Sequence, residues 1–402
     1  MPTYDIQAKN NQGKIISGKI LASSEEEAYR KMVKSGLIPK SIIEIPEAFD
    51  IKKFLNQYSR ISLKALMFFS KQLSSMVGAG LPIARCLETL AEEEENENFA
   101  RIIKAVSAEI QSGIAFNEAL SKYPKVFPKI YIKGVKAGEA AGELDKILGK
   151  LSTQLENDYE TISRIRSAMM YPIFVLVILV AVGVALLTWV IPQIKGIFVD
   201  TGMVLPLPTR LLIGLSDAII HYGLIMLGGL VGALFGFKYY INTEQGRFLW
   251  DSFKLKIPVL GKLFQKVYMD RFTGTLGTLL AAGLPILEAI EITGEAIGNK
   301  KYQSFLMNAR EVVKDGTPLS VPVKESKLFP RMVSQMLVVG EETGKTDESL
   351  DELEKFYHRE VEIIVKSISS LIEPVLILII GLAVSALIAS IIWPIYNLTN
   401  SL

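Results

Sequence analysis

The segment Gly340–Thr346 (GEETGKT) is the stretch of this sequence whose residue types most resemble a chemical site. A glycine-rich turn that ends in Gly-Lys-Thr can hold nucleotide phosphates on its backbone N–H groups. A working loop of this kind has four residues between its first glycine and the Gly-Lys pair, and only three stand here. One missing residue changes which N–H groups face the phosphates, so we do not predict nucleotide binding.

Three carboxylates, those of Glu139, Glu143 and Asp145, lie close together in the sequence and could attract a hard divalent cation. Acidic residues are also common where a helix begins, because the macrodipole favours negative charge there. This second explanation needs no ion. The three residues are therefore weak candidates, and the sequence predicts no metal site and no cofactor.

Histidine and cysteine are scarce, since the chain has only His221, His358 and Cys86. Neither histidine has a nearby serine or cysteine that could complete a catalytic set. We interpret His221 as a residue at the edge of an apolar segment, His358 as a solvated residue on a charged helix, and Cys86 as a packing residue. We therefore predict that the protein is not an enzyme.

Three apolar segments are long enough to cross a membrane, which takes about 20 residues. They are residues 171–191, 218–237 and 371–395; the second is the weakest, because it contains His221 and several glycines. Charged residues still make up 21% of the 402 residues, so soluble domains must accompany the spans. A net charge of +2 gives no basic field that would favour nucleic acid.

The distribution of Lys and Arg orients these segments, because positive loops stay in the cytoplasm. The loop 192–217 has only Lys195 and Arg210, and no basic residue follows the third segment. The basic residues cluster before the first segment, after the second and before the third: Arg164, Arg166, Lys238, Arg247, Lys254, Lys256, Lys355, Arg359 and Lys366. We predict a cytoplasmic N-terminus, an extracytoplasmic loop at 192–217 and an extracytoplasmic C-terminus.

The sequence repeats itself at an offset of about 200 residues, which is a signature of duplication. AGLPI stands at 79–83 and again at 282–286, and GEAAGELD at 138–145 matches GEETGKTD at 340–347. The register continues into the first and third apolar segments. We predict two homologous cytoplasmic helical bundles, at 60–168 and 262–370. In this alignment Glu143 stands opposite Lys345, which also argues against a phosphate site.

The repeated GExxG segments are interpreted as interhelical turns, in which glycine allows special backbone conformations and close packing. We expect the repeated positions to be structural or to contact a partner. They are Gly80, Pro82, Gly138, Glu139, Gly142, Gly283, Pro285, Gly340, Glu341 and Gly344.

Residues 1–50 have a different pattern, with alternating residues at Tyr4–Ala8, a turn at Asn10–Gly13 and a helix start at Ser24 with Glu27. The pattern predicts a small ββαβ module, which either docks a partner or only stabilises the first bundle. The predicted fold is therefore mainly α: a polytopic membrane protein with this module, two homologous cytoplasmic bundles and three transmembrane helices.

The duplicated AGLPI segments, the Phe-Pro and GExxG segments, and spans that begin Tyr-Pro and Glu-Pro resemble the bacterial PilC/GspF family of platform proteins. The resemblance implies a multi-pass inner-membrane protein of a type IV pilus or type II secretion machine. It implies coupling of a cytoplasmic hexameric assembly ATPase to insertion of pilin or pseudopilin subunits, contacts with other inner-membrane components and lipid, and homo-oligomers. It leaves open whether the machine builds a pilus, exports protein or takes up DNA.

An alternative reading is a small-solute transporter, because transporters are also built from internal repeats. The small number of spans, three, and the lack of a polar site at the middle of the membrane argue against it.

Overall fold

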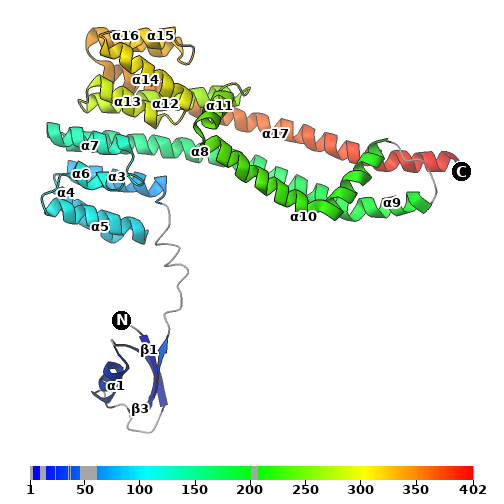
Figure 1. The fold of residues 1–402 in the computed structure, drawn as a ribbon, viewed down its shortest axis with the longest axis horizontal. Coiled ribbons are helices and arrows are strands. Elements are labelled where there is room, and N and C mark those ends of the chain that lie inside the picture. The colour runs from blue at the N-terminus through cyan, green and yellow to red at the C-terminus, as the bar shows by residue number, and fades with distance from the viewer. Residues whose placement is uncertain are drawn as a thin grey trace. The chain divides into compact units, whose positions relative to one another are not determined.

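The computed structural model describes residues 3–9, 15–22, 24–34, 36, 38–45, 61–200 and 207–401, and most of them are helical (Figure 1). The chain divides into two compact units. One combines Met1–Ser62 with Leu87–Ala105, and the other combines Leu63–Cys86 with Val106–Leu402.

The described residues of the N-terminal region form a three-stranded antiparallel sheet and one helix. Its elements are β1 (Thr3–Lys9), β2 (Ile15–Leu21), α1 (Glu25–Lys34) and β3 (Ile38–Ile45), and the strand order is β2-β1-β3. Ser24 Oγ accepts a hydrogen bond from the Glu27 N–H at 3.3 Å, as its predicted capping role requires. The predicted turn at Asn10–Gly13 lies outside the described residues, whereas the strands before and after it, β1 and β2, are described. The small core consists of Tyr4, Ile6, Ala22, Ala28 and Met32.

Two series of six helices follow one another, and the helices rank by length in the same way in both series. The first is α3 (Leu63–Gly78), α4 (Ile83–Glu93), α5 (Glu97–Gln111), α6 (Phe116–Ser121), α7 (Lys129–Ala141) and α8 (Leu144–Ala185). The second is α12 (Leu260–Ala281), α13 (Ile286–Ala296), α14 (Lys300–Lys314), α15 (Ser320–Glu325), α16 (Arg331–Thr343) and α17 (Thr346–Ser401).

Matching aromatic pairs support the repeat at the level of packing. The rings of Phe69 and Phe127 lie 6.0 Å apart, and those of Phe272 and Phe329 lie 5.0 Å apart. Each pair joins the first helix of a series to the loop before the fifth helix. All four side chains are buried, so the same core contact stabilises both halves.

The first turn of each series is set by glycine and proline, as the AGLPI motif indicates. Gly80 and Gly283 have φ of +85° and +77°, a conformation that glycine adopts without strain. Pro82 and Pro285 stand directly before α4 and α13, where a missing N–H leaves no helix bond unmade.

Three helices are long and apolar enough to cross a membrane: α8 with its continuation to Gln193, α10 (Leu207–Asn242) and α17. They extend away from the helices α12 to α16 of the second bundle (Figure 1). The 42 residues of α8 alone span about 63 Å, roughly twice the hydrocarbon thickness. The charged N-terminal parts of α8 and α17, up to Arg166 and Lys366, therefore lie outside the membrane-spanning segments.

The segment predicted as an extracytoplasmic loop, 192–217, is largely helical in its described part. A π-helical turn at Leu186–Val190 leads from α8 directly into α9 (Ile191–Asp200), and α10 begins at Leu207. Pro192 cannot donate a helix bond and its ring crowds the carbonyl four residues earlier, and the wider π turn accommodates it. Lys195 pairs with Asp217 at 2.7 Å, which links α9 to α10.

Candidate functional site

The repeated glutamates of the GExxG motifs bind the first turns of short helices. Glu139, near the end of α7, accepts hydrogen bonds from the backbone N–H groups of Phe116 at 2.7 Å and Asn117 at 2.9 Å. Glu341, near the end of α16, accepts one from Ser320 at 3.2 Å. Helices α6 and α15 have no side-chain cap of their own, so a neighbouring helix supplies the acceptor that their free N–H groups need.

The two glycines of each motif have different roles. Gly138 and Gly340 lie inside their helices, where a Cβ would come within 3.1 Å of the Ile147 side chain or 2.7 Å of the Thr346 Cα. The last glycines, Gly142 and Gly344, end their helices at a φ of 70°. The interpretation of GExxG as a turn is thus correct only for its last glycine; the first four residues belong to a helix that packs closely against the next one.

The lysine of the phosphate-loop-like segment is engaged locally. The Lys345 amine contacts the Glu348 carboxylate at 3.0 Å, and its backbone N–H donates to the Gly340 carbonyl. The N–H group is therefore turned into the helix end rather than towards an open loop.

The weak metal candidates do not come together around one point. Both oxygens of Glu139 accept backbone N–H groups, and Glu143 pairs with Lys146 at 2.6 Å. Among the described residues, no group of three or more His, Cys, Asp or Glu side chains is placed to hold an ion.

A half-buried polar cluster lies where α8, α12 and α17 meet, and sequence reasoning did not find it. We call it the junction and define it by Asn157 and Asp158 of α8, Asp270 and Arg271 of α12, and Glu354 and His358 of α17. An apolar layer of Leu263, Val267, Val361, Val365 and Ile368 continues from it along α12 and α17.

His358 is at the centre of the junction. Its Nδ1 lies 3.7 Å from Asp270 Oδ2, and its Nε2 lies 4.0 Å from Glu160 Oε2. Only 19% of the His358 side chain is exposed, so the interpretation of a solvated histidine is wrong. The nearby Asp270 carboxylate raises the pKa of His358, against the opposing effect of burial. This histidine faces the interior because α12 packs along that side of α17.

Two carboxyls of the junction, those of Glu354 and Asp158, have a raised pKa, which favours their neutral forms. Burial raises the pKa of Glu354 to about 7, although Asn157 Nδ2 donates to its Oε1 at 2.9 Å. Burial also raises the pKa of Asp158, while the Arg271 guanidinium, 3.2 Å away, opposes the rise. The junction therefore holds several titratable groups that compete for few positive partners.

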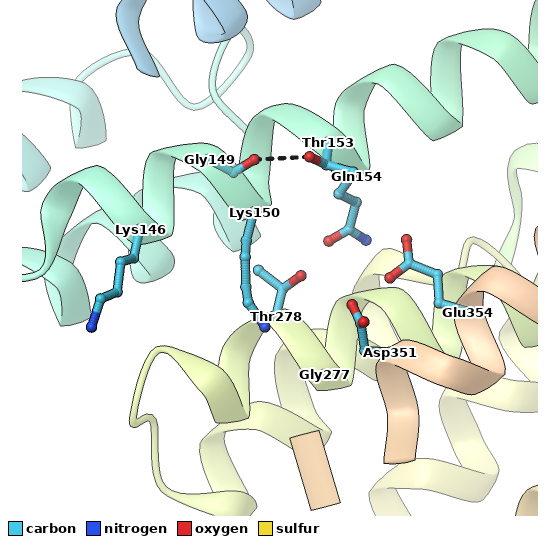
Figure 2. Close-up of a pocket in the computed structure, with 9 residues that line it drawn as sticks. All are labelled: Lys146, Gly149, Lys150, Thr153, Gln154, Gly277, Thr278, Asp351 and Glu354. Carbon is cyan, nitrogen blue, oxygen red and sulfur yellow. Dashed lines mark hydrogen bonds between the residues drawn. The ribbon is translucent and has the colours of Figure 1, made fainter. Parts of the chain in front are cut away.

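A cleft of about 410 Å³ opens beside the junction (Figure 2). Lys146 and Lys150 lie on the α8 side, and Asp351 and Glu354 lie on α17. Glycines of α12 let α17 come close, because a Cβ on Gly274 would be 2.8 Å from the Glu354 carboxyl carbon and one on Gly277 3.1 Å from Leu350 Cβ. The lining groups offer ion pairing and hydrogen bonding, but no nucleophile with an adjacent base.

Comparison of the two halves of the sequence did not reveal the junction, because its residues are not repeated. At the offset of 203 residues, Asp270 and Arg271 correspond to Met67 and Phe68. One signal was present in the sequence: Asp270 and Arg271 interrupt the otherwise uncharged run Val267–Leu280. A charge pair within such a run indicates a buried partner on another helix.

Comparisons with known proteins agree with this architecture. The family described as type II secretion system (T2SS), protein F, matches residues 69–192 and again 272–394, and its N-terminal domain matches residues 1–43. The chain is 37% identical over 404 residues to a type IV pilus assembly protein PilC of Thermus thermophilus, covering 100% of this chain and 99% of that protein.

Relatives from both kinds of machine align over nearly their full lengths. A PilC of Myxococcus xanthus is 32% identical, with 98% of this chain and 95% of that protein covered. The type II secretion system protein F of Vibrio cholerae is 27% identical, with 100% and 99% covered. The two matched halves confirm the duplication, and the chain belongs to the PilC/GspF family of type IV pilus assembly and type II secretion proteins.

Proposed function

We propose that this chain is an inner-membrane platform protein that couples a cytoplasmic assembly ATPase to insertion of pilin or pseudopilin subunits into a filament. The observation that carries the proposal is the pair of repeated helical bundles, each ending in a candidate span, in a chain that aligns end to end with pilus and secretion relatives. ATP hydrolysis then belongs to the partner.

The proposed topology places both bundles in the cytoplasm. The basic residues before α8's apolar part, after α10 and before α17's apolar part support this placement. Helix α10 returns the chain to the side where it began, so the second bundle faces the same ATPase as the first. The C-terminal end of α17 is then extracytoplasmic.

In the proposed function, continuous helices transmit motion from the bundles to the spans. Helices α8 and α17 each run from a bundle into a candidate span, so a rigid displacement of a bundle moves the attached span. Helices from the two halves are also joined directly. Lys129 pairs with Glu295 at 2.9 Å, and Arg164 pairs with Glu362 at 2.7 Å. These contacts, with the junction, favour movement of the two halves as one body.

Deletion of the gene tests this function. We expect a deletion strain to make its pilin and ATPase but to assemble no filament, and the wild-type chain to restore assembly. Lys345→Ala is the matched variant: it should restore filaments fully, because Lys345 holds no phosphate in this proposal. Normal filaments or secretion in the deletion strain would exclude the platform role.

A further inference from the structure

Helix α11 (Glu244–Lys254) follows the second candidate span and has an exposed face without charge. That face is formed by residues at positions i, i+3, i+4, i+7 and i+8, which lie on one side of a helix: Gln245, Phe248, Leu249, Ser252 and Phe253. Phe248 is 44% exposed, Leu249 58% and Phe253 55%. The exposed face of a helix in contact with water normally carries charged side chains. The exposed face of α11 carries large apolar side chains in their place.

On the opposite side of α11, the charged residue Asp251 anchors the helix to the protein. Asp251 is buried, and its carboxylate accepts the Lys300 N–H at 2.9 Å at the start of α14 and contacts the Lys254 amine at 2.9 Å. Asn299 Nδ2 donates to the Asp251 carbonyl at 3.3 Å. These contacts fix the rotation of α11, so the apolar face cannot turn inwards.

The connection to α10 places α11 directly beside the end of the predicted span 218–237. Thr243 Oγ1 accepts the Gly246 N–H at 3.2 Å and begins α11 directly after α10 ends. The Trp250 ring lies 5.3 Å from the ring of Phe237, the last residue of the predicted span 218–237. Tyr239 and Tyr240 beside it are exposed, as is usual for aromatic residues at a membrane surface.

The basic residues around the apolar face of α11 are complementary in charge to an anionic membrane surface. Lys238 and Lys256 flank α11, Arg247 lies within it, and Lys254 lies over the Trp250 ring with its Nζ 5.9 Å from the ring centroid. One of the two acids of α11, Asp251, is buried and paired, so it contributes little to the exposed field.

We propose that α11 is an interfacial helix that buries Phe248, Leu249 and Phe253 in the cytoplasmic leaflet of an anionic phospholipid membrane. Continuity with a membrane span, exposed aromatic residues and flanking lysines together select lipid as the occupant of this face. Through Asp251 and the N-terminus of α14, the same helix holds the second bundle at the membrane surface. The inference rests on the proposed placement of residues 218–237 as a span.

The test uses the full chain with single cysteines labelled by an environment-sensitive fluorophore, in vesicles of phosphatidylglycerol and phosphatidylethanolamine. Labels are placed by Leu249→Cys, Phe253→Cys and Gln245→Cys, the last of which removes no apolar group. Leu227→Cys in the middle of the span and Val312→Cys on α14 are the controls, and the native Cys86 is fully buried. Lipids brominated near the headgroup or deep in the acyl chain serve as quenchers.

Shallow bromines should quench the labels at 245, 249 and 253 more than deep bromines do, deep bromines should quench 227, and neither should quench 312. If 227 is quenched while 245, 249 and 253 behave like 312, the interfacial helix is refuted and the span stands. If 227 is also unquenched, the proposed span itself fails. Label-to-label proximity between copies without lipid quenching would assign the face to a second copy and overturn the proposal.

Discussion

At the residue scale, Glu139 and Glu341 hold matching positions in the two repeats and perform the same task. Each carboxylate accepts N–H groups from the first turn of a short helix that lacks its own cap. Charge-assisted bonds of this kind are stronger than neutral ones. The repeated glutamate therefore has a structural explanation within the chain, whatever its contacts with a partner.

Removing the Glu139 carboxylate should destabilise the protein. Glu139→Ala leaves the N–H groups of Phe116 and Asn117 without their acceptor, and we expect the free energy of unfolding to fall by about 1–2 kcal/mol. Chemical denaturation of the detergent-solubilised chain measures this change. Glu143→Ala is the control: it removes only a surface pair with Lys146 and should change stability by less than about 0.5 kcal/mol. Equal effects of both variants would contradict the capping role.

The junction should make stability depend on pH. The raised pKa of Glu354 means that the folded chain binds this proton more tightly than the unfolded chain does. Its contribution is fully present below the ordinary value of 4.5 and is lost as pH rises through about 7. The pKa of His358 is also raised, so its contribution is present below 6.5 and is lost at higher pH.

We therefore expect the thermal midpoint of the wild-type chain to fall between pH 5 and pH 8, and Glu354→Gln to make this dependence flatter. Glu352→Gln alters an exposed carboxylate two residues away and should leave the slope unchanged. A wild-type midpoint that rises over this range would contradict the assignment of neutral carboxyls to the junction.

At the element scale, close helix packing depends on the first glycine of each GExxG motif. A Cβ on Gly340 would lie 2.7 Å from the Thr346 Cα, whereas one on Gly138 would lie 3.1 Å from the Ile147 Cβ and 3.2 Å from the Leu144 Cα. The shorter distance at Gly340 requires a larger displacement of the neighbouring helix. The two positions therefore differ in tolerance although they match in the repeat.

Gly340→Ala should accordingly cost more stability than Gly138→Ala. We expect a loss of about 1–3 kcal/mol for Gly340→Ala, because overpacking forces α16 and α17 apart, and a smaller loss for Gly138→Ala. Parallel unfolding curves of the two variants give the comparison. If the order is reversed, the approach of α17 to Gly340 is not as close as the structure has it.

Much of the element order could be predicted from glycine, proline and helical periodicity. Gly80, Gly142, Gly283 and Gly344 all have the positive φ that their places after helices indicate, because few other residues adopt this conformation without strain. The helical structure at 192–200 and 207–217 could not be predicted, since a proline such as Pro192 normally ends a helix and the π turn that accommodates it leaves no local sequence pattern.

The junction was beyond sequence reasoning for a different reason. His358 lies among charged residues on α17, and its sequence neighbours are those of an exposed helix. Its burial follows from Asp270, which is 88 positions earlier in the chain and packs against it only after α12 and α17 associate. Likewise, the sequence pattern did not reveal the uncharged face of α11, because charged residues such as Arg247 stand between its members in the sequence.

At the scale of the whole molecule, the chain combines two related bundles, three candidate spans and an N-terminal region that matches its own family domain. In the proposed function, the bundles contact a cytoplasmic partner and the candidate spans contact membrane-embedded subunits. We propose that residues 1–50 contribute to docking the ATPase. A platform that only anchors and transmits motion needs no reactive site of its own.

Binding of the cognate assembly ATPase to the full chain in nanodiscs, measured by mass photometry or surface plasmon resonance, tests this account most directly. We predict a saturable complex that also captures pilin subunits, and weaker ATPase binding when residues 1–50 are deleted. The chain alone should hydrolyse no ATP. Absence of binding to both the ATPase and the pilin, with a chain that still shows its native unfolding transition, would contradict the platform function.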